Sequence, residues 1–305
     1  MTLQQIYYAL IIAEEGSMNR AAGRLFVSQP ALTGTIQSLE SEIDITIFSR
    51  SKRGVSLTAE GEEFLKYARQ LYQQYEVLED KYGAEGSRRK KFAVSAQHYT
   101  FAVRAFTDTV RHFGTLQFEF AMRETKTREV IADVGSGRSE VGILFLSDLN
   151  EQVIMRMLRQ ENLTFSDIAQ ATAYVYLHES HPLAGRDAVS LKELLPYPCL
   201  AFEQDAQSSV FLSEEILSEK EYPRKILVND RATMLNLIEE LKGYTLCSGI
   251  IYDEMNGSGF RSVPFLEDAE NKNSTMRIGY IVKKNSIRSE MGQYFLEACI
   301  RYVGG

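Results

Sequence analysis

Two short helices joined by a tight turn are predicted within residues 17–40, and this pattern limits the fold more than any other feature of the chain. Ser17 can cap the first helix and Ser28 the second, because a serine hydroxyl accepts a hydrogen bond from an otherwise unpaired backbone N–H. Pro30 falls in the first turn of the second helix, where a missing N–H costs little. The side chains expected to point inward from the first helix and the turn are Ala21, Ala22, Leu25 and Phe26.

A segment of this size has the dimensions of a helix-turn-helix, whose second helix enters the major groove of DNA. The spacing alone fits equally well a pair of packed helices that binds nothing. In a groove, the Gln29 amide can bond a purine edge, and the methyl groups of Ala31 and Thr33 can contact a thymine methyl.

A β-hairpin with a basic tip is predicted after these helices, where residues 50–54 turn between two short strands. Lys52 and Arg53 at the tip can contact phosphate or the minor groove, and a solvated basic turn is the alternative. The candidate DNA-binding residues are Asn19, Arg20, Ser28, Gln29, Pro30, Ala31, Thr33, Gln37, Arg50, Lys52 and Arg53.

A long amphipathic helix is predicted over residues 58–82, with Thr58 as its cap. Its apolar side chains recur at alternating steps of four and three, which is typical of a coiled-coil seam. The alternative is packing on its own chain, but a lone amphipathic helix between two domains needs a partner, most simply its own copy. The candidate dimerisation residues are Phe64, Ala68, Leu71, Tyr75, Leu78 and Tyr82.

Strands and helices alternate after a basic run at residues 88–91. This βαβαβ pattern predicts a parallel sheet with right-handed crossovers. Its strands are expected at 92–95, 116–121 and 141–145, and its helices at 100–113 and 127–134. Further strands are expected at 172–177, 200–202, 226–228, 244–247 and 276–282, with helices at 231–241 and 289–303.

The 305 residues fit two or three domains. A net charge of −7 argues against nonspecific coating of nucleic acid, although a small region with its own local field can still bind DNA. The three cysteines are far apart and the four histidines lack metal-ligand spacing, so no disulfide framework and no metal site are expected.

Neither a phosphate-binding glycine loop nor a nucleophile motif occurs, so no cofactor, no catalytic residues and no enzymatic activity are expected. No apolar run is long enough to span a bilayer, and no positive flank precedes the apolar patch at residues 6–12. A cytoplasmic protein without a membrane partner is therefore expected.

The motifs of the first 65 residues resemble those of the LysR-type transcriptional regulators. The stretch Gly16–Thr33 is similar to the family signature, and the stretches 39–50 and 53–61 are similar to it in order and spacing. Beyond about residue 90 only the order and length of the elements match.

The resemblance implies a multidomain fold: an all-α-rich winged helix-turn-helix, a long linker helix and an α/β two-lobed effector-binding domain like the type II periplasmic binding proteins. The implied boundaries are 1–57 for the DNA-binding domain, 58–82 for the dimerisation helix, 83–90 for a hinge and 91–305 for the effector-binding domain. Lobe I would comprise about 91–163 and 268–305, and lobe II about 164–267.

An effector site is expected where loops leave the carboxyl ends of parallel strands and helices begin. Hydroxyls and amides there suit a carboxylate, so a small acid or an amino-acid-like metabolite is the expected effector, although ordinary helix capping is the alternative for each residue. The resemblance adds a second side to the site near residues 203–204 and 248–249. The candidate effector-binding residues are Ser95, Gln97, Thr100, Thr125, Thr127, Glu203 and Ser248.

The implied partners are double-stranded DNA with an imperfect palindromic operator, a small-molecule effector and a second copy of the chain. Palindromy follows because a twofold protein reads twofold DNA. The homodimer is expected to pair into a homotetramer, and RNA polymerase is a further candidate partner.

Two residues depart from the family pattern: Gly34 stands where a basic residue is usual, and Asp44 where a glycine is common. Residues 1–61 hold five basic and six acidic side chains, a net charge near −1. Weak nonspecific binding with a shallow salt dependence is therefore expected.

Two other classes of function compete with a regulator. Residues 91–305 could form a stand-alone solute-binding module, which the missing signal peptide and the helix-turn-helix oppose. They could form an enzyme, which would need a set of catalytic residues that the sequence does not show.

Overall fold

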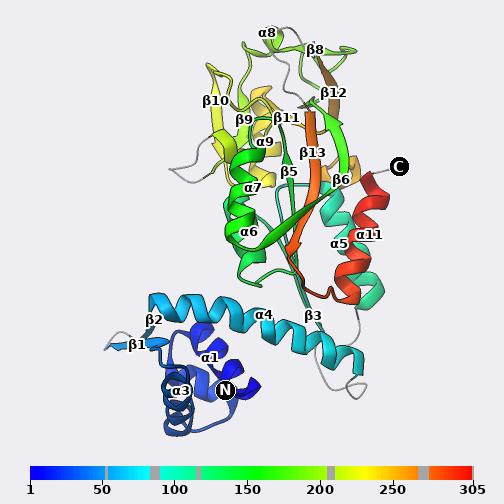
Figure 1. The fold of residues 1–305 in the computed structure, drawn as a ribbon. Helices are drawn as coiled ribbons and strands as arrows, with labels where there is room; N and C mark the ends of the chain where they lie inside the picture. The colour runs from blue at the N-terminus through cyan, green and yellow to red at the C-terminus, as the bar shows by residue number, and fades with distance from the viewer. Residues whose placement is uncertain (52–53, 83–89, 115–117, 205–209, 267–274, 304–305) are drawn as a thin grey trace. The chain divides into compact units, whose positions relative to one another are not determined.

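The computed structural model describes residues 1–303 except 52–53, 83–89, 115–117, 205–209 and 267–274 (Figure 1). The chain divides into a first unit over residues 1–87 and a second unit that takes up most of residues 88–305. Each unit has its own buried core.

The first unit begins with three helices: α1 (Leu3–Glu15), α2 (Met18–Leu25) and α3 (Gln29–Ile43). The predicted caps are confirmed, since the Ser17 hydroxyl accepts from the Arg20 N–H at 3.5 Å and the Ser28 hydroxyl from the Ala31 N–H at 3.3 Å. Leu32, the innermost side chain of the first turns of α3, is fully buried among α1 and α2. Its burial fixes which face of α3 remains outside.

The predicted hairpin consists of β1 (Phe48–Ser51) and β2 (Gly54–Leu57), which pair antiparallel. The Glu40 carboxylate accepts hydrogen bonds from the N–H groups of Ile47 at 2.7 Å and Phe48 at 3.0 Å. A side chain near the end of α3 thus holds the start of β1.

The long helix α4 (Ala59–Tyr82) begins as predicted at Thr58, whose hydroxyl accepts from the Gly61 N–H at 2.9 Å. Leu65 and Ala68 are buried in the core of the first unit, and the Tyr72 ring stacks on Tyr7 with 5.0 Å between centroids. Ala68, expected on the dimerisation seam, therefore packs against its own unit instead.

A five-stranded sheet forms the first half of the second unit, in the order β4-β3-β5-β13-β6. β3 (Lys90–Ala96), β4 (Phe118–Glu124) and β5 (Val141–Leu146) are parallel, as predicted from the βαβαβ pattern. β6 (Leu163–Thr172) and β13 (Thr275–Lys283) run antiparallel, so the sheet is mixed. Because β6 belongs to this sheet, the lobe boundary expected near residue 164 falls after Thr172.

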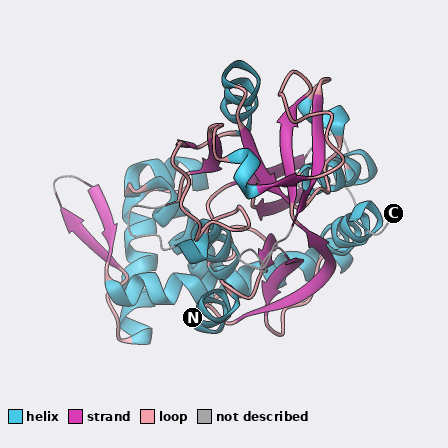
Figure 2. Cartoon of the chain, turned by 90° about the horizontal axis from the view of Figure 1, so that it is seen from above, coloured by secondary structure: helices cyan, strands magenta, loops and turns pink. Residues whose placement is uncertain are grey.

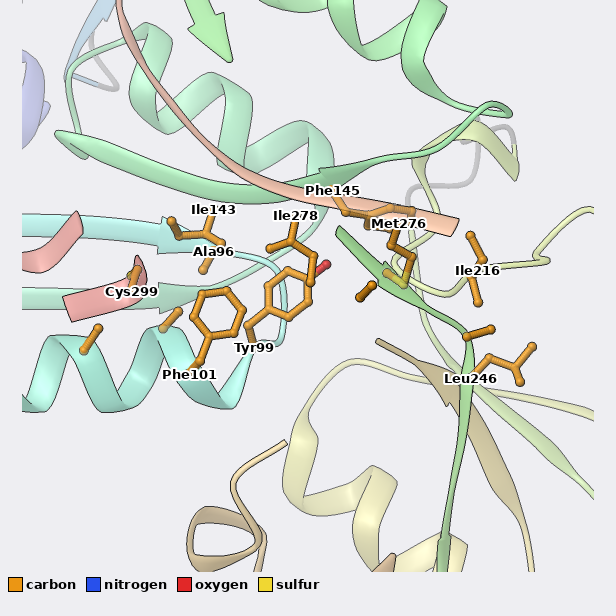
Figure 3. Close-up of a cluster of buried hydrophobic side chains, with 14 of the residues drawn as sticks. Ala96, Tyr99, Phe101, Ile143, Phe145, Ile216, Leu246, Met276, Ile278 and Cys299 are labelled. Carbon is orange, nitrogen blue, oxygen red and sulfur yellow. The ribbon is translucent and has the colours of Figure 1, made fainter. Parts of the chain in front are cut away.

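Helices cover both faces of this sheet (Figures 1 and 2). Ile143 and Phe145 of β5 pack with α5 (Thr100–Phe113) and α11 (Glu290–Val303), as Figure 3 shows for part of the cluster. Leu144 and Leu146 point the other way and pack with α6 (Thr127–Gly135) and α7 (Glu151–Gln160). Helix α7 was not predicted from the sequence. We call this sheet with its four helices lobe I.

A six-stranded sheet in the order β10-β9-β11-β7-β12-β8 forms the second half, which we call lobe II. Its helices α8 (Leu191–Leu194), α9 (Arg231–Leu241) and α10 (Asp253–Asn256) lie between strands in sequence. Asp230 caps α9 as predicted, accepting from the Thr233 N–H at 2.8 Å. The strands are β7 (Tyr174–His178), β8 (Val189–Ser190), β9 (Cys199–Phe202), β10 (Lys225–Val228), β11 (Tyr244–Cys247) and β12 (Phe260–Leu266). Of these, β8 and β12 were not predicted.

One segment of lobe II reaches into lobe I. The single turn η1 (Val210–Leu212), which follows β9, places Leu212 in the cluster formed by α6, α7 and β5. The residues directly after η1 therefore lie where the two lobes meet.

Candidate functional site

The outer face of α3 presents the polar side chains that the sequence singles out. Ser28, Gln29, Pro30, Ala31 and Gln37 are exposed, and Thr33 is half-buried. The outer face therefore combines amide, hydroxyl and methyl groups, which suit base edges in a major groove.

The basic residues of α2 are paired with acids of α1. The exposed Arg20 guanidinium bonds the Glu15 carbonyl oxygen, and its Nε lies 3.6 Å from the Glu15 carboxylate. Arg24 contacts Glu14 at 2.8 Å and Glu15 at 3.0 Å. These pairs offset much of the positive charge on this side of the unit. Asn19 is exposed beside them.

Phe26, in the turn between α2 and α3, is 96% exposed, so the expectation that it points inward is wrong. It ends α2 in the left-handed conformation, with φ of 55°, and this turns its side chain away from the core. Apolar spacing did not reveal this, because Phe26 directly follows Leu25, which does pack inward.

Lys52 and Arg53 lie outside the described residues, as does the side chain of Arg50. The backbone of Arg50 pairs with Val55 across the hairpin.

An apolar stripe runs along the side of α4 that its own unit leaves uncovered. Tyr67, Leu71 and Leu78 are 64%, 45% and 54% exposed. Phe64 and Tyr75 border this stripe and are half-buried, and Phe64 also packs against the core of the first unit. The side chain of Tyr82 lies outside the described residues. Tyr67 was not among the predicted seam residues.

An open cleft lies between the two lobes. Lobe I contributes the loop from Gln97 to Thr100 together with Met276. Lobe II contributes Phe202, the Glu214–Glu215 pair, the start of α9 and the residues that follow β11.

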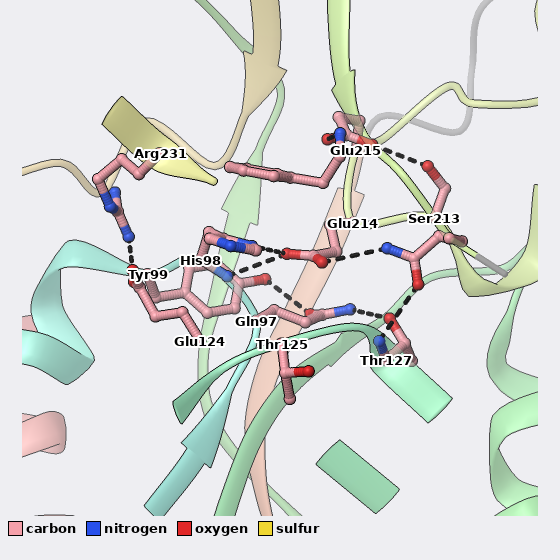
Figure 4. A network of polar contacts seen from close by, with 12 residues as sticks. Gln97, His98, Tyr99, Glu124, Thr125, Thr127, Ser213, Glu214, Glu215 and Arg231 are labelled. Atoms are coloured by element: carbon pink, nitrogen blue, oxygen red, sulfur yellow. Dashed lines mark hydrogen bonds and ion pairs between the residues drawn. The ribbon is translucent and has the colours of Figure 1, made fainter. Parts of the chain in front are cut away.

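His98 and Glu214 join the two sides of this cleft (Figure 4). The Glu214 Oε2 atom accepts from the His98 backbone N–H at 3.0 Å and lies 2.8 Å from His98 Nδ1. The His98 ring stacks on Phe202 with 3.6 Å between centroids, and the Gln204 amide donates to Glu214 Oε1 at 3.1 Å. The two paired side chains are only 8% and 5% exposed.

A second set of hydrogen bonds links the start of α6 to lobe II. The Gln97 amide donates to the Thr127 hydroxyl at 2.6 Å, and that hydroxyl donates to the Leu212 carbonyl at 2.8 Å. The Thr127 backbone N–H donates to Gln204 Oε1 at 3.2 Å. Arg231 at the start of α9 pairs with Glu124 at the end of β4.

Three of the seven predicted effector-binding residues line the cleft: Gln97, Thr100 and Ser248. The other four do not. Ser95 is buried inside lobe I, where its hydroxyl lies 2.6 Å from Asp133 and 2.9 Å from Ser139. Thr125 bonds Glu129, Thr127 is buried in the link described above, and the Glu203 side chain is exposed outside the cleft.

The main charged residues of the cleft were missed. Glu214, Glu215 and Arg231 come from a segment without a motif and from a helix start that looked like ordinary surface. Burial, followed by the charge of Glu214, raises the pKa of Glu215 to about 7. Glu215 Oε1 accepts from the Phe202 N–H at 2.7 Å, and Oε2 accepts from the Ser213 hydroxyl at 2.8 Å.

Within the described residues, no three His, Cys, Asp or Glu side chains gather in a way that could hold a metal ion. The same part of the chain has no helix that is both long and apolar enough to cross a bilayer. Burial raises the pKa of the cleft thiol of Cys247 to about 12.

Comparison with known proteins gives the same two-part organisation. Residues 3–62 match the family model of bacterial regulatory helix-turn-helix proteins of the lysR family, and residues 97–303 match the LysR substrate binding domain. The uncharacterized regulator YnfL of Escherichia coli is 30% identical over 68% of both chains. The regulator AlsR of Bacillus subtilis is 24% identical over 87% of this chain and 80% of its own.

Solved structures share the fold. Full-length OxyR from Pseudomonas aeruginosa, in a variant form, has a TM-score of 0.67 at 17% identity, covering 99% of this chain and 94% of its own. CbnR complexed with its target DNA has a TM-score of 0.57 at 19% identity, covering 99% of this chain and 100% of its own. The chain therefore belongs to the LysR family of bacterial helix-turn-helix transcriptional regulators.

Proposed function

We propose that this regulator reads a specific operator with the first turns of α3, and that a small molecule in the cleft between the lobes controls that binding. The observation that carries the first part is the outer face of α3, where Gln29 and Ala31 are exposed and Thr33 is half-buried beside a capped helix start. Amide and methyl groups at such a helix start suit the edges of adenine and thymine in a major groove.

The likeness to CbnR, whose solved structure holds its target DNA, supports the same placement. Asn19, Arg20 and the hairpin tip would contact the phosphate backbone and position α3, because such contacts fix register without reading sequence. A regulator of this kind works where the DNA is, so a cytoplasmic location belongs to the proposal.

A homodimer would form along the α4 stripe defined by Phe64, Tyr67, Leu71, Tyr75 and Leu78. Three of these side chains are about half exposed or more, which is unfavourable unless a second copy covers them. A twofold dimer would read an imperfect palindrome, and pairing of dimers would give a tetramer. RNA polymerase remains a candidate partner at the promoter.

Replacing Leu71 by Glu tests the stripe, because a charge in a closed apolar seam is unfavourable. Sedimentation should show the variant dissociating at concentrations where the wild type is dimeric. Gln70→Glu introduces the same charge one residue away and should leave the assembly intact. Equal behaviour of both variants would contradict dimerisation through this stripe.

The operator proposal is tested by selection of genomic fragments with the full chain and with the double variant Gln29→Ala, Ala31→Asp. The double variant should lose the enriched sequence, whereas Gln293→Ala on the exposed side of α11 should retain it. If the double variant enriched the same sequence, the proposal that α3 recognises the operator would be contradicted.

Effector control requires reciprocal coupling. If the small molecule changes operator affinity by some factor, the operator must change the affinity for the small molecule by the same factor. Calorimetric titration with and without operator DNA measures this directly, and equal affinities would exclude the coupling.

A further inference from the structure

The two helix starts that suit an anionic ligand are already filled by oxygens of the protein itself. Before α5, the Glu214 carboxylate accepts from His98 at 3.0 and 2.8 Å. At the start of α6, the Gln204 carbonyl oxygen accepts from the Thr127 N–H at 3.2 Å. An incoming carboxylate would have to displace these groups and would then face Glu214 itself (Figure 4).

The positive charge of the cleft is offset as well. Among its described lining residues, Arg231 and His98 are the only side chains able to carry a positive charge. Arg231 is paired with Glu124, and His98 with Glu214. Glu215 adds a further acidic group, so with Glu124, which pairs with Arg231 from outside the lining, three acidic side chains stand against two basic ones and the local field favours a cation.

A buried acceptor without a partner also points to a hydrogen-bond donor in the cleft. Asn256 is 8% exposed and lines the cleft. Its amide nitrogen donates to the Tyr176 hydroxyl at 2.9 Å, but its Oδ1 atom has no partner among the residues that the structure describes. A buried acceptor left unpaired is unfavourable, and a donor on a bound ligand would relieve this.

The remaining lining is apolar and aromatic. Phe202 and Tyr99 lie beside the charged groups, and Met234, Leu246 and Met276 extend the apolar wall. Aromatic faces attract a desolvated cation, and the apolar wall suits a short hydrocarbon body.

We propose that the effector is a small molecule with a positively charged amine on an apolar body, held by Glu214 and Glu215 with a further donor to Asn256. A carboxylate on the same molecule is allowed but is not what the site selects. This inference rests on the proposed sensing function, and it narrows the expected small acid or amino-acid-like metabolite to molecules that carry an amine.

The environment of Glu215 agrees with this charge preference. Its pKa is raised to about 7 by burial and by the charge of Glu214, so the cleft already resists a further negative charge. An ammonium group beside the two carboxylates would favour their charged forms.

Matched probes separate the charge types. Leucine, 3-methylbutylamine and 4-methylpentanoate share one carbon skeleton, and phenylalanine, phenethylamine and 3-phenylpropanoate share another. Each probe is titrated into the full-length protein while the melting temperature is followed, because a ligand of the native state raises it. The amines or amino acids are expected to raise the melting temperature, and the acids are not.

Two variants locate the effect. Glu214→Gln should weaken binding of the amine-bearing probes at least about tenfold, as expected when a buried charged partner is lost. Glu240→Gln, an exposed change of the same charge on α9, should leave binding unchanged. Asn256→Leu should weaken binding of the same probes, and the ligand-free variant should keep its stability. This variant therefore tests the proposal even if Glu214→Gln fails to fold.

The outcomes distinguish this inference from the function on which it rests. Stabilisation by the acids alone, or amine binding that Glu214→Gln and Asn256→Leu leave unchanged, would overturn the ammonium assignment and leave the sensing function standing. No stabilisation by any probe of either skeleton would count against small-molecule sensing in this cleft, and the assignment would fall with it.

Discussion

The Gln29 side-chain amide donates a hydrogen bond to the Thr33 hydroxyl at 2.9 Å, one turn further along α3. This bond uses one N–H of the exposed amide and leaves the other N–H and the carbonyl oxygen available to DNA. These are the two groups that an adenine edge requires. Thr33 therefore orients the amide before DNA arrives, so less side-chain entropy is lost on binding.

Replacing Thr33 by Val should weaken recognition of the operator without changing the fold. The shape is kept, but the acceptor for Gln29 is lost, so about 0.5–1.5 kcal/mol of discrimination should disappear, roughly 2- to 13-fold in affinity. Binding to the operator and to operators with single A-to-G changes measures this. Thr35→Val is the matched control, because its hydroxyl bonds the Ala31 carbonyl on the same helix. Equal losses in both variants would contradict the orienting role.

Phe26→Asn should stabilise the protein. Phe26 has a φ of 55° and is 96% exposed, so its ring contributes almost no packing while its backbone is strained. Asparagine tolerates the left-handed region far better, and the expected gain is about 1 kcal/mol. Calorimetry of the full chain should show a higher melting temperature for the first unit. A lower melting temperature would mean that the ring packs in solution.

A structural feature could be predicted from the sequence where contacts between residues close together in the chain determine it. Caps such as Ser17, Ser28 and Asp230 were predicted because each bonds a backbone group three residues away. The parallel strands β3, β4 and β5 followed from alternation along the chain. The prediction that Phe26 points inward was wrong because one backbone angle, not the apolar pattern, decides where its side chain points.

The cleft residues were harder to predict, because they are brought together by contacts between distant parts of the chain. Glu214 meets His98 across 116 residues, and Arg231 meets Glu124 across 107. No spacing rule relates such pairs, so these acids looked like ordinary surface. The β6 strand was missed for a similar reason: its partner β13 lies more than 100 residues further along the chain.

Glu15→Gln should strengthen nonspecific DNA binding and steepen its salt dependence. Glu15 contacts both Arg20 and Arg24, so its neutralisation frees positive charge on the side of α2. Each additional phosphate contact should change the slope of log K against log salt by about −0.9. Titrations at several salt concentrations measure the slope. Glu42→Gln, an equal change of charge elsewhere on the first unit, should have a smaller effect. A slope that Glu15→Gln leaves unaltered would show that neither arginine reaches phosphate.

Glu215→Gln should remove a pH-dependent loss of stability. The folded-state pKa of Glu215 is about 7, above its ordinary value of 4.5, so between these values the folded protein holds a proton that the unfolded chain has released. The free energy of unfolding therefore falls as pH rises from about 4.5 to 7, by an amount on the order of 3 kcal/mol. Glutamine resembles the protonated acid and does not titrate. The stability of the variant relative to the wild type should consequently increase from about pH 5 to about pH 8 in urea unfolding. A difference that stays constant over this range would mean that Glu215 is ionised in the folded protein at low pH, and that the carboxylates of the cleft are better solvated than their burial indicates.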